Sequence, residues 1–524
     1  MGVHGRIRRA AILAGAALLV TGVLTGCDAG PEPEASEPPP DRRTPSATAE
    51  GEPGSPGLPA ALTSQRPDWK RCKAPQGGTD PGSGWRCATV DVPLDYAKPA
   101  GETIGIALIR KEARDEGRRL GSMLFNFGGP GGSGVDFLPR AASSYEKLNS
   151  RYDLVGFDPR GVAASSGVRC RTDGEQETTH RTVDMTPDTP AEEAAFVKDG
   201  AAFGAGCERR SGTLLPHVGT SDAARDMDLI RHVLGDGKLS YFGISYGTEL
   251  GATYAHLFPE NVGRTVLDAV VDPTADSVGH ARNQATGFQR ALENYLKGRG
   301  QDPKAGTERI ARLLQRIDGQ PLPTDSGRKL NESLAITGIV TPLYSESSWP
   351  ALTSALDEAE KSGTGNELLR LADAYNGRDA DGGYDTQSHS QRAISCADTK
   401  ARPTAADARA LLPEFRKLSP VFGPFLAWDT AGWCAQWPVD GEHETPEASA
   451  PGAGPILVIG TTGDPATPYE GARKMADELG EGVGVMVTNK GEGHGAYGES
   501  VCVTSTVDDY FLDGKVPADG KTCS

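Results

Sequence analysis

The sequence predicts an α/β fold, with a mostly parallel central sheet that starts antiparallel and carries an inserted helical cap. Short apolar runs typical of buried strands alternate with helical stretches from the third run onward, the pattern of parallel strands joined by right-handed crossovers. The alternation stops after about residue 273, where helix-like segments continue to about residue 442, and then it resumes. The predicted strands cover residues 87–92, 103–109, 123–127, 152–157, 239–243, 265–271, 456–460 and 483–487.

A serine between two glycines stands at the junction of one predicted strand and one predicted helix. Residues 243–247 read Gly-Ile-Ser-Tyr-Gly, after the apolar run 239–243 and before a helix-like stretch over 248–258. This is the G-x-S-x-G nucleophile elbow, in which a sharp turn exposes the serine hydroxyl at the start of a helix. Small neighbours let the turn close, and the helix N-terminus favours developing negative charge. The motif predicts that Ser245 is the nucleophile of an α/β-hydrolase fold.

Two loops after later strands supply candidates for an acid and a base. A serine hydroxyl needs a histidine to take its proton and a carboxylate to orient that histidine. Asp464 follows the apolar strand 456–460, and His494 lies in a Gly-Glu-Gly-His-Gly loop after the run 483–487. Serine, then aspartate, then histidine is the chain order of an α/β-hydrolase. The alternatives are a solvent-exposed loop histidine and an aspartate that only shapes the turn before Pro465.

A glycine-rich loop follows the predicted strand 123–127 and suits an oxyanion hole. Residues 128–134 read Gly-Gly-Pro-Gly-Gly-Ser-Gly, and such a loop can bring backbone N–H groups against a substrate carbonyl. The second donor is the N–H of the residue after the nucleophile, Tyr246. The loop lacks the Gly-Lys-Ser/Thr ending of a phosphate-binding loop. A flexible linker is the remaining alternative.

Five motifs in this order resemble the tripeptidyl aminopeptidase branch of the prolyl aminopeptidase-type α/β-hydrolases, over nearly all of residues 69–523. They are the glycine loop 128–134, Asp-Pro-Arg-Gly at 158–161, the elbow, the Asp464 turn and Gly-His-Gly at 493–495. The resemblance implies a secreted bacterial serine exopeptidase that uses no cofactor.

The resemblance also implies roles for single residues. It places the nucleophile on Ser245, the acid on Asp464, the base on His494, and oxyanion donors near Gly129 and at Tyr246. The chain departs from the family pattern at two positions. Phe127 stands where these enzymes usually have a histidine, and Glu249 stands where an aromatic or small residue is expected. Both departures concern the substrate preference and leave the chemistry intact.

Length and charge limit the class of protein. The chain has 524 residues and a formal net charge of −17, and an α/β-hydrolase with an inserted cap takes up most of that length. Residues 1–26 contain three arginines and no acid, so the charge becomes −20 without them. Such a surface repels nucleic acid and anionic lipid, and no nucleic-acid partner is expected.

The N-terminal segment predicts export and lipidation. Residues 1–26 combine a basic start with an apolar stretch at 10–23, which is shorter than the ~20 residues that span a bilayer. Leu-Thr-Gly-Cys at 24–27 resembles the bacterial lipobox, so we expect a lipid on Cys27 that anchors the protein to the cell membrane, facing outward. A plainly secreted protein is the alternative, and the general and twin-arginine routes both stay open. Residues 27–64 are rich in Pro, Glu and Ser and predict a disordered tether.

The cysteine count agrees with an oxidising compartment. Nine cysteines less Cys27 leave eight, an even number. Nearest-neighbour pairing predicts four disulfides: Cys72 with Cys87, Cys170 with Cys207, Cys396 with Cys434, and Cys502 with Cys523. Free buried thiols are the alternative. None of the eight has the spacing of metal ligands, so no metal site is expected.

The folded part is expected to be a core in two pieces with a cap between them. The core covers residues 65–275 and 443–524, the second piece carrying the acid and the base. The helical cap, residues 276–442, would lie over the active site. If the cap disulfide forms, Asp398 is brought towards the pocket, where a carboxylate could bind the free α-amino group of a peptide. A surface or capping aspartate is the alternative.

These features favour a surface-anchored serine peptidase that releases short peptides, such as tripeptides, from free N-termini through an acyl-enzyme. Peptides with free N-termini are then the expected partners, together with the membrane through the lipid anchor. A carboxylesterase or lipase uses the same machinery and is the first alternative. A non-catalytic surface binding protein on this scaffold is the second, against which the retention of nucleophile, acid and base argues.

Overall fold

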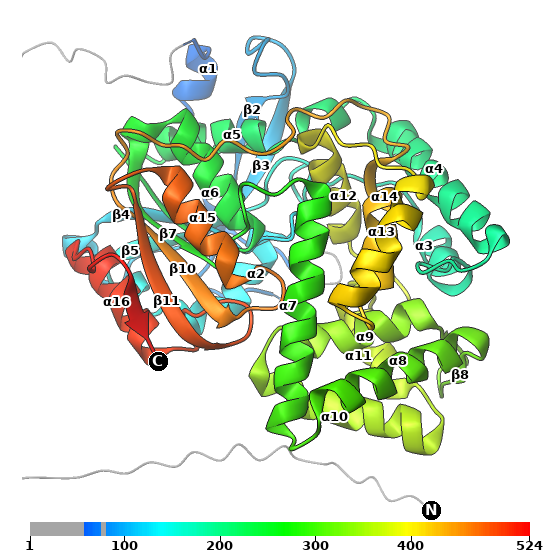
Figure 1. Ribbon diagram of the computed structural model, residues 1–524. Helices are drawn as coiled ribbons and strands as arrows, with labels where there is room; N and C mark the ends of the chain where they lie inside the picture. Colours follow the sequence, from blue (N-terminus) through cyan, green and yellow to red (C-terminus); the bar gives the residue numbers. More distant parts are fainter. Residues whose placement is uncertain (1–56, 75–79) are drawn as a thin grey trace, which may run out of the picture. The chain divides into compact units, whose positions relative to one another are not determined.

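The computed structural model describes residues 57–74 and 80–524 (Figure 1). The expected export signal at 1–26, the lipidation site Cys27 and the tether as far as residue 56 lie outside the described residues. Within the described ranges, no helix is both long enough and apolar enough to cross a membrane.

A ten-stranded sheet forms the centre of the fold, in the order β1-β2-β3-β5-β4-β6-β7-β10-β11-β12. The pairs from β1 to β5 are antiparallel, and all pairs from β5 to β12 are parallel. The predicted mostly parallel sheet with an antiparallel start is therefore confirmed. The strands are β1 (Lys70–Arg71), β2 (Arg86–Pro93), β3 (Thr103–Lys111), β4 (Gly121–Asn126), β5 (Tyr152–Phe157), β6 (Leu239–Ile244), β7 (Val262–Asp268), β10 (Ile456–Gly463), β11 (Gly484–Glu492) and β12 (Lys521–Cys523), with a separate hairpin of β8 (Leu322–Pro323) and β9 (Lys329–Leu330).

Helices cover both faces of the sheet (Figure 1). Successive residues of a strand point to opposite faces, and β10 shows this clearly. Ile456 and Val458 belong to one apolar layer, whereas Leu457 and Ile459 belong to the other. The first layer includes α5 (Thr220–Val233), α6 (Tyr246–Leu257) and α15 (Tyr469–Leu479), and the second includes α2 (Gly134–Ala141) and α16 (Val501–Asp513). Burial on both faces explains why these strands are continuous apolar runs in the sequence.

The segment between β7 and β10 is helical and has an apolar core of its own. Its helices are α7 (Ser277–Gly298), α8 (Pro303–Gly319), α9 (Glu332–Leu343), α10 (Trp349–Asp357), α11 (Asn366–Tyr375), α12 (Gln387–Asp398), α13 (Ala405–Leu418) and α14 (Gly423–Cys434). Helix-like patterns at 280–297, 306–317, 349–361, 366–375 and 405–412 in the sequence predict α7, α8, α10, α11 and α13, but the sequence did not predict α9, α12 and α14. Glycine, proline and β-branched residues weaken the helical signal of α9 and α14, and packing in the cap overrides that weak propensity.

A second helical insertion lies between β5 and β6. It contains α3 (Asp173–Thr182) and α4 (Pro190–Ser211), which precede the elbow and were expected to belong to the core. The ring of Phe196 on α4 packs edge-on against Trp428 of α14, with centroids 5.5 Å apart. The cap of the structure therefore includes α4 as well as the helices after β7.

The expected tether is too long at its C-terminal end. Residues 60–63 form the short helix α1 (Ala60–Thr63), and Leu62 in it is buried. Leu58 packs against the same apolar cluster, and the Gln65 side-chain amide donates a hydrogen bond to the Asp91 carbonyl at 2.8 Å. Two leucines in an otherwise polar stretch are enough to dock this segment, so the fold begins before residue 64.

The structure contains the four disulfides that nearest-neighbour pairing predicts: Cys72–Cys87, Cys170–Cys207, Cys396–Cys434 and Cys502–Cys523. Each bridge joins elements that already lie side by side. Cys502–Cys523 ties α16 to the edge strand β12, and Cys396–Cys434 ties the cap helices α12 and α14.

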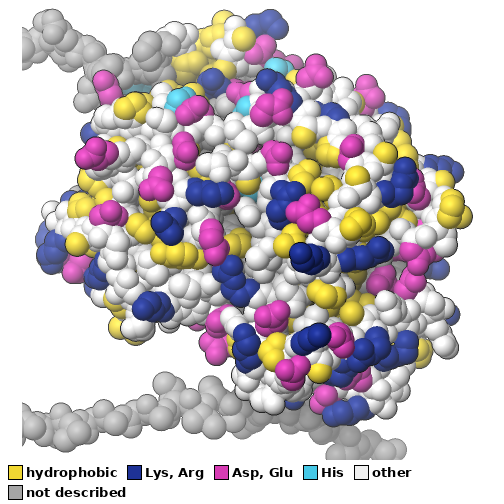
Figure 2. All heavy atoms as spheres, in the orientation of Figure 1, with side chains coloured by type: hydrophobic (Ala, Val, Ile, Leu, Met, Phe, Trp, Pro, Cys, Tyr) yellow, Lys and Arg dark blue, Asp and Glu magenta, His cyan; other side chains and the backbone are white. Residues whose placement is uncertain are grey.

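Charges of both signs are mixed over the face of the molecule that Figure 2 shows. Lys and Arg side chains alternate there with Asp and Glu. A nucleic-acid-binding face carries a basic stripe or patch, whereas the face shown mixes both signs in a chain of net charge −17.

Candidate active site

Ser245 occupies a sharp turn between β6 and α6. Its φ of 57° and ψ of −126° are unusual for a residue with a side chain. A Cβ on Gly243 would lie 2.3 Å from the Gly247 carbonyl oxygen, and a Cβ on Gly247 would lie 2.6 Å from the Asn126 carbonyl oxygen. Both glycines of the motif are therefore required by close backbone approach.

Hydrogen bonds from three elements hold this turn. The Ser245 N–H donates to the carbonyl of Asp268 on β7 at 3.1 Å, and the Thr248 N–H donates to the Ser245 carbonyl at 2.8 Å. The Tyr241 hydroxyl donates to the Gly247 carbonyl at 2.7 Å. The strained conformation is thus fixed by the sheet, and the Ser245 side chain lines the active-site cavity.

Asp464 and His494 form a hydrogen-bonded pair at the ends of β10 and β11. The His494 Nδ1–H donates to Oδ1 of Asp464 at 2.9 Å, with Oδ2 at 3.1 Å. Oδ1 also accepts the N–H groups of Ala466 and Thr467 at 3.0 and 2.9 Å, and Oδ2 accepts the Thr467 hydroxyl at 3.0 Å. The carboxylate is fully buried, so these donors replace its hydration.

The charge of Asp464 shapes the acid–base behaviour of His494. Burial lowers the pKa of His494, but the negative charge and hydrogen bond of Asp464 outweigh burial, so the pKa is raised above the ordinary value of 6.5. Because Nδ1 carries the proton that Asp464 accepts, Nε2 of the neutral ring is left to accept a proton from a nucleophile.

The loop of His494 is held from the core and from the cap. On the core side, the Asp268 carboxylate accepts the N–H groups of Ala496 and Tyr497 at 3.0 and 2.9 Å. On the cap side, the His494 N–H donates to the Tyr344 carbonyl at 2.8 Å, and the Tyr344 ring packs edge-on against the imidazole with centroids 5.3 Å apart. Asp268 therefore bonds both the elbow, through its carbonyl, and the histidine loop, through its carboxylate.

The glycine loop lies directly against the elbow. A Cβ on Gly128, where φ is +88°, would lie 2.7 Å from the Ser245 Cβ and 3.1 Å from the Tyr246 nitrogen. Gly129 lines the cavity, and nothing in the described part of the chain accepts a hydrogen bond from its N–H. Tyr246 is the first residue of α6, where backbone N–H groups lack intrahelical acceptors. The two expected oxyanion donors thus lie on adjoining segments.

The Asp-Pro-Arg-Gly motif holds the glycine loop and the start of α2. The Asp158 carboxylate accepts the Ser133 hydroxyl at 2.6 Å and the Val135 N–H at 3.1 Å. Arg160 is fully buried and makes a two-pronged ion pair with Asp226, with nitrogen–oxygen distances of 2.6 and 2.7 Å. The motif is therefore structural, and it positions the oxyanion loop rather than touching the cavity.

A cavity of about 800 Å³ joins these residues. Ser245, His494 and Gly129 line it from the core, residues of α4, α7, α9, α12 and α14 line it from the cap, and residues of α3 complete it. Among the described residues no hydrogen bond joins Ser245 to His494, and such bonds often tighten only when substrate is bound. The described ranges contain no cluster of three or more side chains that could hold a metal ion.

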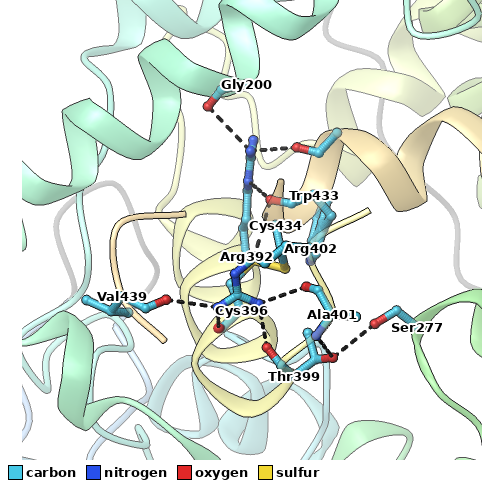
Figure 3. Close-up of a disulfide and its surroundings, with 11 residues drawn as sticks. Gly200, Ser277, Arg392, Cys396, Thr399, Ala401, Arg402, Trp433, Cys434 and Val439 are labelled. Carbon is cyan, nitrogen blue, oxygen red and sulfur yellow. Dashed lines mark hydrogen bonds between the residues drawn. A yellow bond between two sulfur atoms is a disulfide. The ribbon is translucent and has the colours of Figure 1, made fainter. Parts of the chain in front are cut away.

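The cap disulfide Cys396–Cys434 lies at the cavity, which Cys434 lines, and Figure 3 shows its surroundings. Two arginines flank it and donate to backbone carbonyl groups. Arg392 donates to the carbonyls of Gly432 and Trp433 at the end of α14, and Arg402 donates to those of Cys396 and Val439. These bonds and the disulfide fix α12, the helix that ends at Asp398.

Asp398 lines the cavity, but both of its oxygens already have partners. Oδ1 accepts the Thr220 N–H and Oδ2 accepts the Thr220 hydroxyl, both at 2.7 Å. The same hydroxyl lies 2.6 Å from the Tyr246 hydroxyl. Glu249 lines the cavity on the elbow side, close enough for its charge and that of Asp398 to act on each other.

Sequence reasoning missed four residues that support the site: Asp268, Thr467, Tyr344 and Thr220. Asp268 ends a strand and Thr467 follows Asp464 by three residues, so their positions in the sequence gave a weak indication that they lie at the site. Tyr344 and Thr220 lie far from the motifs in sequence, and only the fold brings them to the cavity.

Comparison with known proteins gives several similar chains. The family described as TAP-like protein matches residues 419–523, which include Asp464 and His494. Serine protease Hip1 of Mycobacterium tuberculosis is 34% identical over 482 residues, 87% of this chain and 90% of that protein. Carboxylesterase B of the same organism is 37% identical over 502 residues, 92% of this chain and 94% of that protein. Tripeptidyl aminopeptidase of Streptomyces lividans is 32% identical over 486 residues, 87% of this chain and 86% of that protein.

Proposed function

The chain belongs to the tripeptidyl aminopeptidase-like serine peptidases of the α/β-hydrolase fold, and we propose that it releases short peptides, tripeptides among them, from free N-termini. Ser245 is the proposed nucleophile, His494 the base and Asp464 the acid. The observation that carries the proposal is the Asp464–His494 pair, whose histidine lines one cavity with Ser245 and the glycine loop.

The proposed reaction is acyl transfer in two steps. Ser245 Oγ attacks the scissile carbonyl carbon while its proton passes to His494 Nε2. The N–H groups of Gly129 and Tyr246 stabilise the negative oxygen of the tetrahedral intermediate. His494 then protonates the leaving nitrogen, the C–N bond breaks and an ester on Ser245 remains. A water molecule attacks that ester as His494 takes its proton. The bond from the acyl carbon to Ser245 Oγ then breaks, His494 returns the proton to Oγ, and the peptide leaves as a carboxylic acid.

The cap supports action at the end of a peptide chain. Helices α7, α12 and α14 line the cavity opposite the sheet, so a substrate must enter a space of about 800 Å³. A site of this size suits a small ligand or a short peptide. A carboxylate such as Asp398 on the cap side would favour the positive charge of a free α-amino group.

Cleavage of one short peptide anilide with a free or an acetylated N-terminus tests the proposal. We expect the free form to react at least about 10-fold faster in kcat/KM, because acetylation removes a charge-assisted hydrogen bond. The Asp398→Asn variant should narrow that difference. Equal rates on the two peptides would contradict an exopeptidase.

Ester hydrolysis is the second candidate function, because the carboxylesterase B relative is 37% identical over nearly the whole chain. The same nucleophile and oxyanion donors act on esters and amides, so the triad does not separate them. A short-chain acyl ester, assayed beside the two peptides, decides the question. A much faster ester reaction together with equal peptide rates would favour the esterase.

The proposed location is the outer face of the cell membrane, through a lipid on Cys27. Four disulfides in the described chain support an oxidising compartment. Cys27→Ser should release the processed protein from the membrane fraction or block its processing. Membrane retention of fully processed Cys27→Ser protein would contradict the anchor.

A further inference from the structure

Glu249 places a carboxylate beside the proposed nucleophile. It lies in the first turn of α6, four residues after Ser245, and both side chains line the same cavity. Ser245 immediately precedes the helix, and side chains in the first turn of a helix lean towards its N-terminus. The Glu249 carboxylate therefore lies near the position that a scissile carbonyl takes on Ser245.

This carboxylate has no partner among the described residues. Neither oxygen of Glu249 receives a hydrogen bond or an ion pair there. Asp398 differs, because Thr220 donates to both of its oxygens. Glu249 is thus a cavity carboxylate beside the elbow whose hydrogen-bonding capacity is left for a ligand.

The groups around Glu249 make the cavity locally acidic. Asp398 on α12 is the charged neighbour that acts on it, and burial together with this charge raises the pKa of Glu249 to about 8. Burial, with further repulsion from Glu442 and Asp222, raises the pKa of Asp398 to about 7. His280 lines the cavity from α7, and burial lowers the pKa of its imidazole, so this side chain favours its neutral form and does not offset the two carboxyls. Two crowded carboxyls without a basic partner are unfavourable, and a cation from the substrate would relieve them.

We propose that Glu249, supported by Asp398, binds a positively charged group that the substrate carries within one residue of the scissile carbonyl. This inference rests on the proposed peptidase function and names its substrate class. When a tripeptide is released, its α-amino group lies two residues away from the scissile residue, about 7 Å in an extended chain. The group at Glu249 is then the side chain of a lysine or arginine that supplies the scissile carbonyl. In single-residue release it is the α-amino group itself.

The test compares matched substrates that differ in one charge. Ala-Ala-Lys and Ala-Ala-norleucine anilides have side chains of similar length, and only the first is charged. We expect the natural enzyme to prefer the lysine substrate by about 10- to 100-fold in kcat/KM. Glu249→Gln keeps the size of the side chain and should abolish this preference while the norleucine rate stays within a few-fold.

Two further variants keep the test decisive. Glu260→Gln makes the same chemical change at an exposed position just after α6, and it should retain the full preference for lysine. Glu249→Asp keeps the charge on a shorter side chain, so it should retain part of the preference for the lysine substrate. This variant replaces Glu249→Gln in the test if the glutamine variant does not fold. Thermal melting of each variant checks folding.

Norleucine anilide with a free or acetylated α-amino group identifies the source of the cation. A free-amine preference that depends on Glu249 assigns the contact to the α-amino group, and a Glu249-dependent lysine preference assigns it to the side chain. Equal kcat/KM for lysine and norleucine, with no Glu249-dependent amine preference, would overturn the inference while Ser245-dependent peptide cleavage still supported the proposed function. Ester hydrolysis without any peptide cleavage would instead overturn the proposed function.

Discussion

Replacing Asp464 by asparagine should reverse the tautomer of His494. In the structure Oδ1 accepts two backbone N–H groups, from Ala466 and Thr467, whereas Oδ2 has no backbone donor and accepts the Thr467 hydroxyl beside His494. An asparagine keeps its oxygen at the Oδ1 position, because an NH₂ group there would face two donors. Its NH₂ group then occupies the Oδ2 position, 3.1 Å from His494 Nδ1, and donates to that nitrogen.

The reversed tautomer has a large kinetic consequence. With Nδ1 accepting, the ring proton moves to Nε2, which then cannot take the proton of Ser245. The corresponding change in a serine protease lowers kcat about 10⁴-fold, and we expect a similar loss here. The pH profile should change as well. Asp464 raises the pKa of His494, so the acid limb of kcat/KM in the natural enzyme should have its midpoint above 6.5. In the variant the midpoint should move to lower pH, because burial is then opposed only by the smaller effect of the Asp268 charge.

The assay is hydrolysis of a short peptide anilide from pH 5 to pH 9, with thermal melting as the check on folding. Asp477→Asn is the matched control, since Asp477 is exposed on α15 and its replacement should leave rate and profile unchanged. A kcat for Asp464→Asn within 10-fold of the natural enzyme, in a folded protein, would refute the assignment of Asp464 as the acid.

Three other changes test the site and its support. Ser245→Ala should lower kcat by about 10⁶-fold without lowering the melting temperature, because the hydroxyl serves the reaction and not the core; ordinary turnover would contradict the elbow assignment. Gly128→Ala should lower kcat by at least about 100-fold, since the new Cβ would lie 2.7 Å from that of Ser245 and displace the oxyanion loop. Gly174→Ala is the control: open space surrounds Gly174, so kcat should not change. Arg160→Met should reduce the free energy of unfolding in urea by about 3–5 kcal/mol, because it leaves buried Asp226 without its ion pair. Adding Asp226→Leu removes the unpaired charge and should recover most of the lost stability. If the second substitution instead lowers the stability further, the unpaired charge is not the cause.

The chemistry that depends on short stretches of chain was readable in the sequence. The elbow is a strand, a tight turn and a helix within about twenty residues, and close backbone approach requires its glycines at 243 and 247. Asp464 and His494 each follow an apolar strand. The carboxyl ends of parallel strands meet at one edge of the sheet, so the two side chains could be expected to lie together there. The disulfides were also predictable, since each joins cysteines that are 15 to 38 residues apart.

Contacts between distant segments were decided only by the tertiary structure. Asp268 bonds the histidine loop 228 and 229 residues away, and Thr220 satisfies Asp398 across 178 residues. The placing of Glu249 near Asp398 also depends on contacts between the core and the cap. The docking of Leu62 against the core likewise occurs in a stretch whose composition indicates a tether. Periodicity and composition describe what a segment can form by itself. They do not encode which partner reaches it, because that depends on how the cap closes over the sheet.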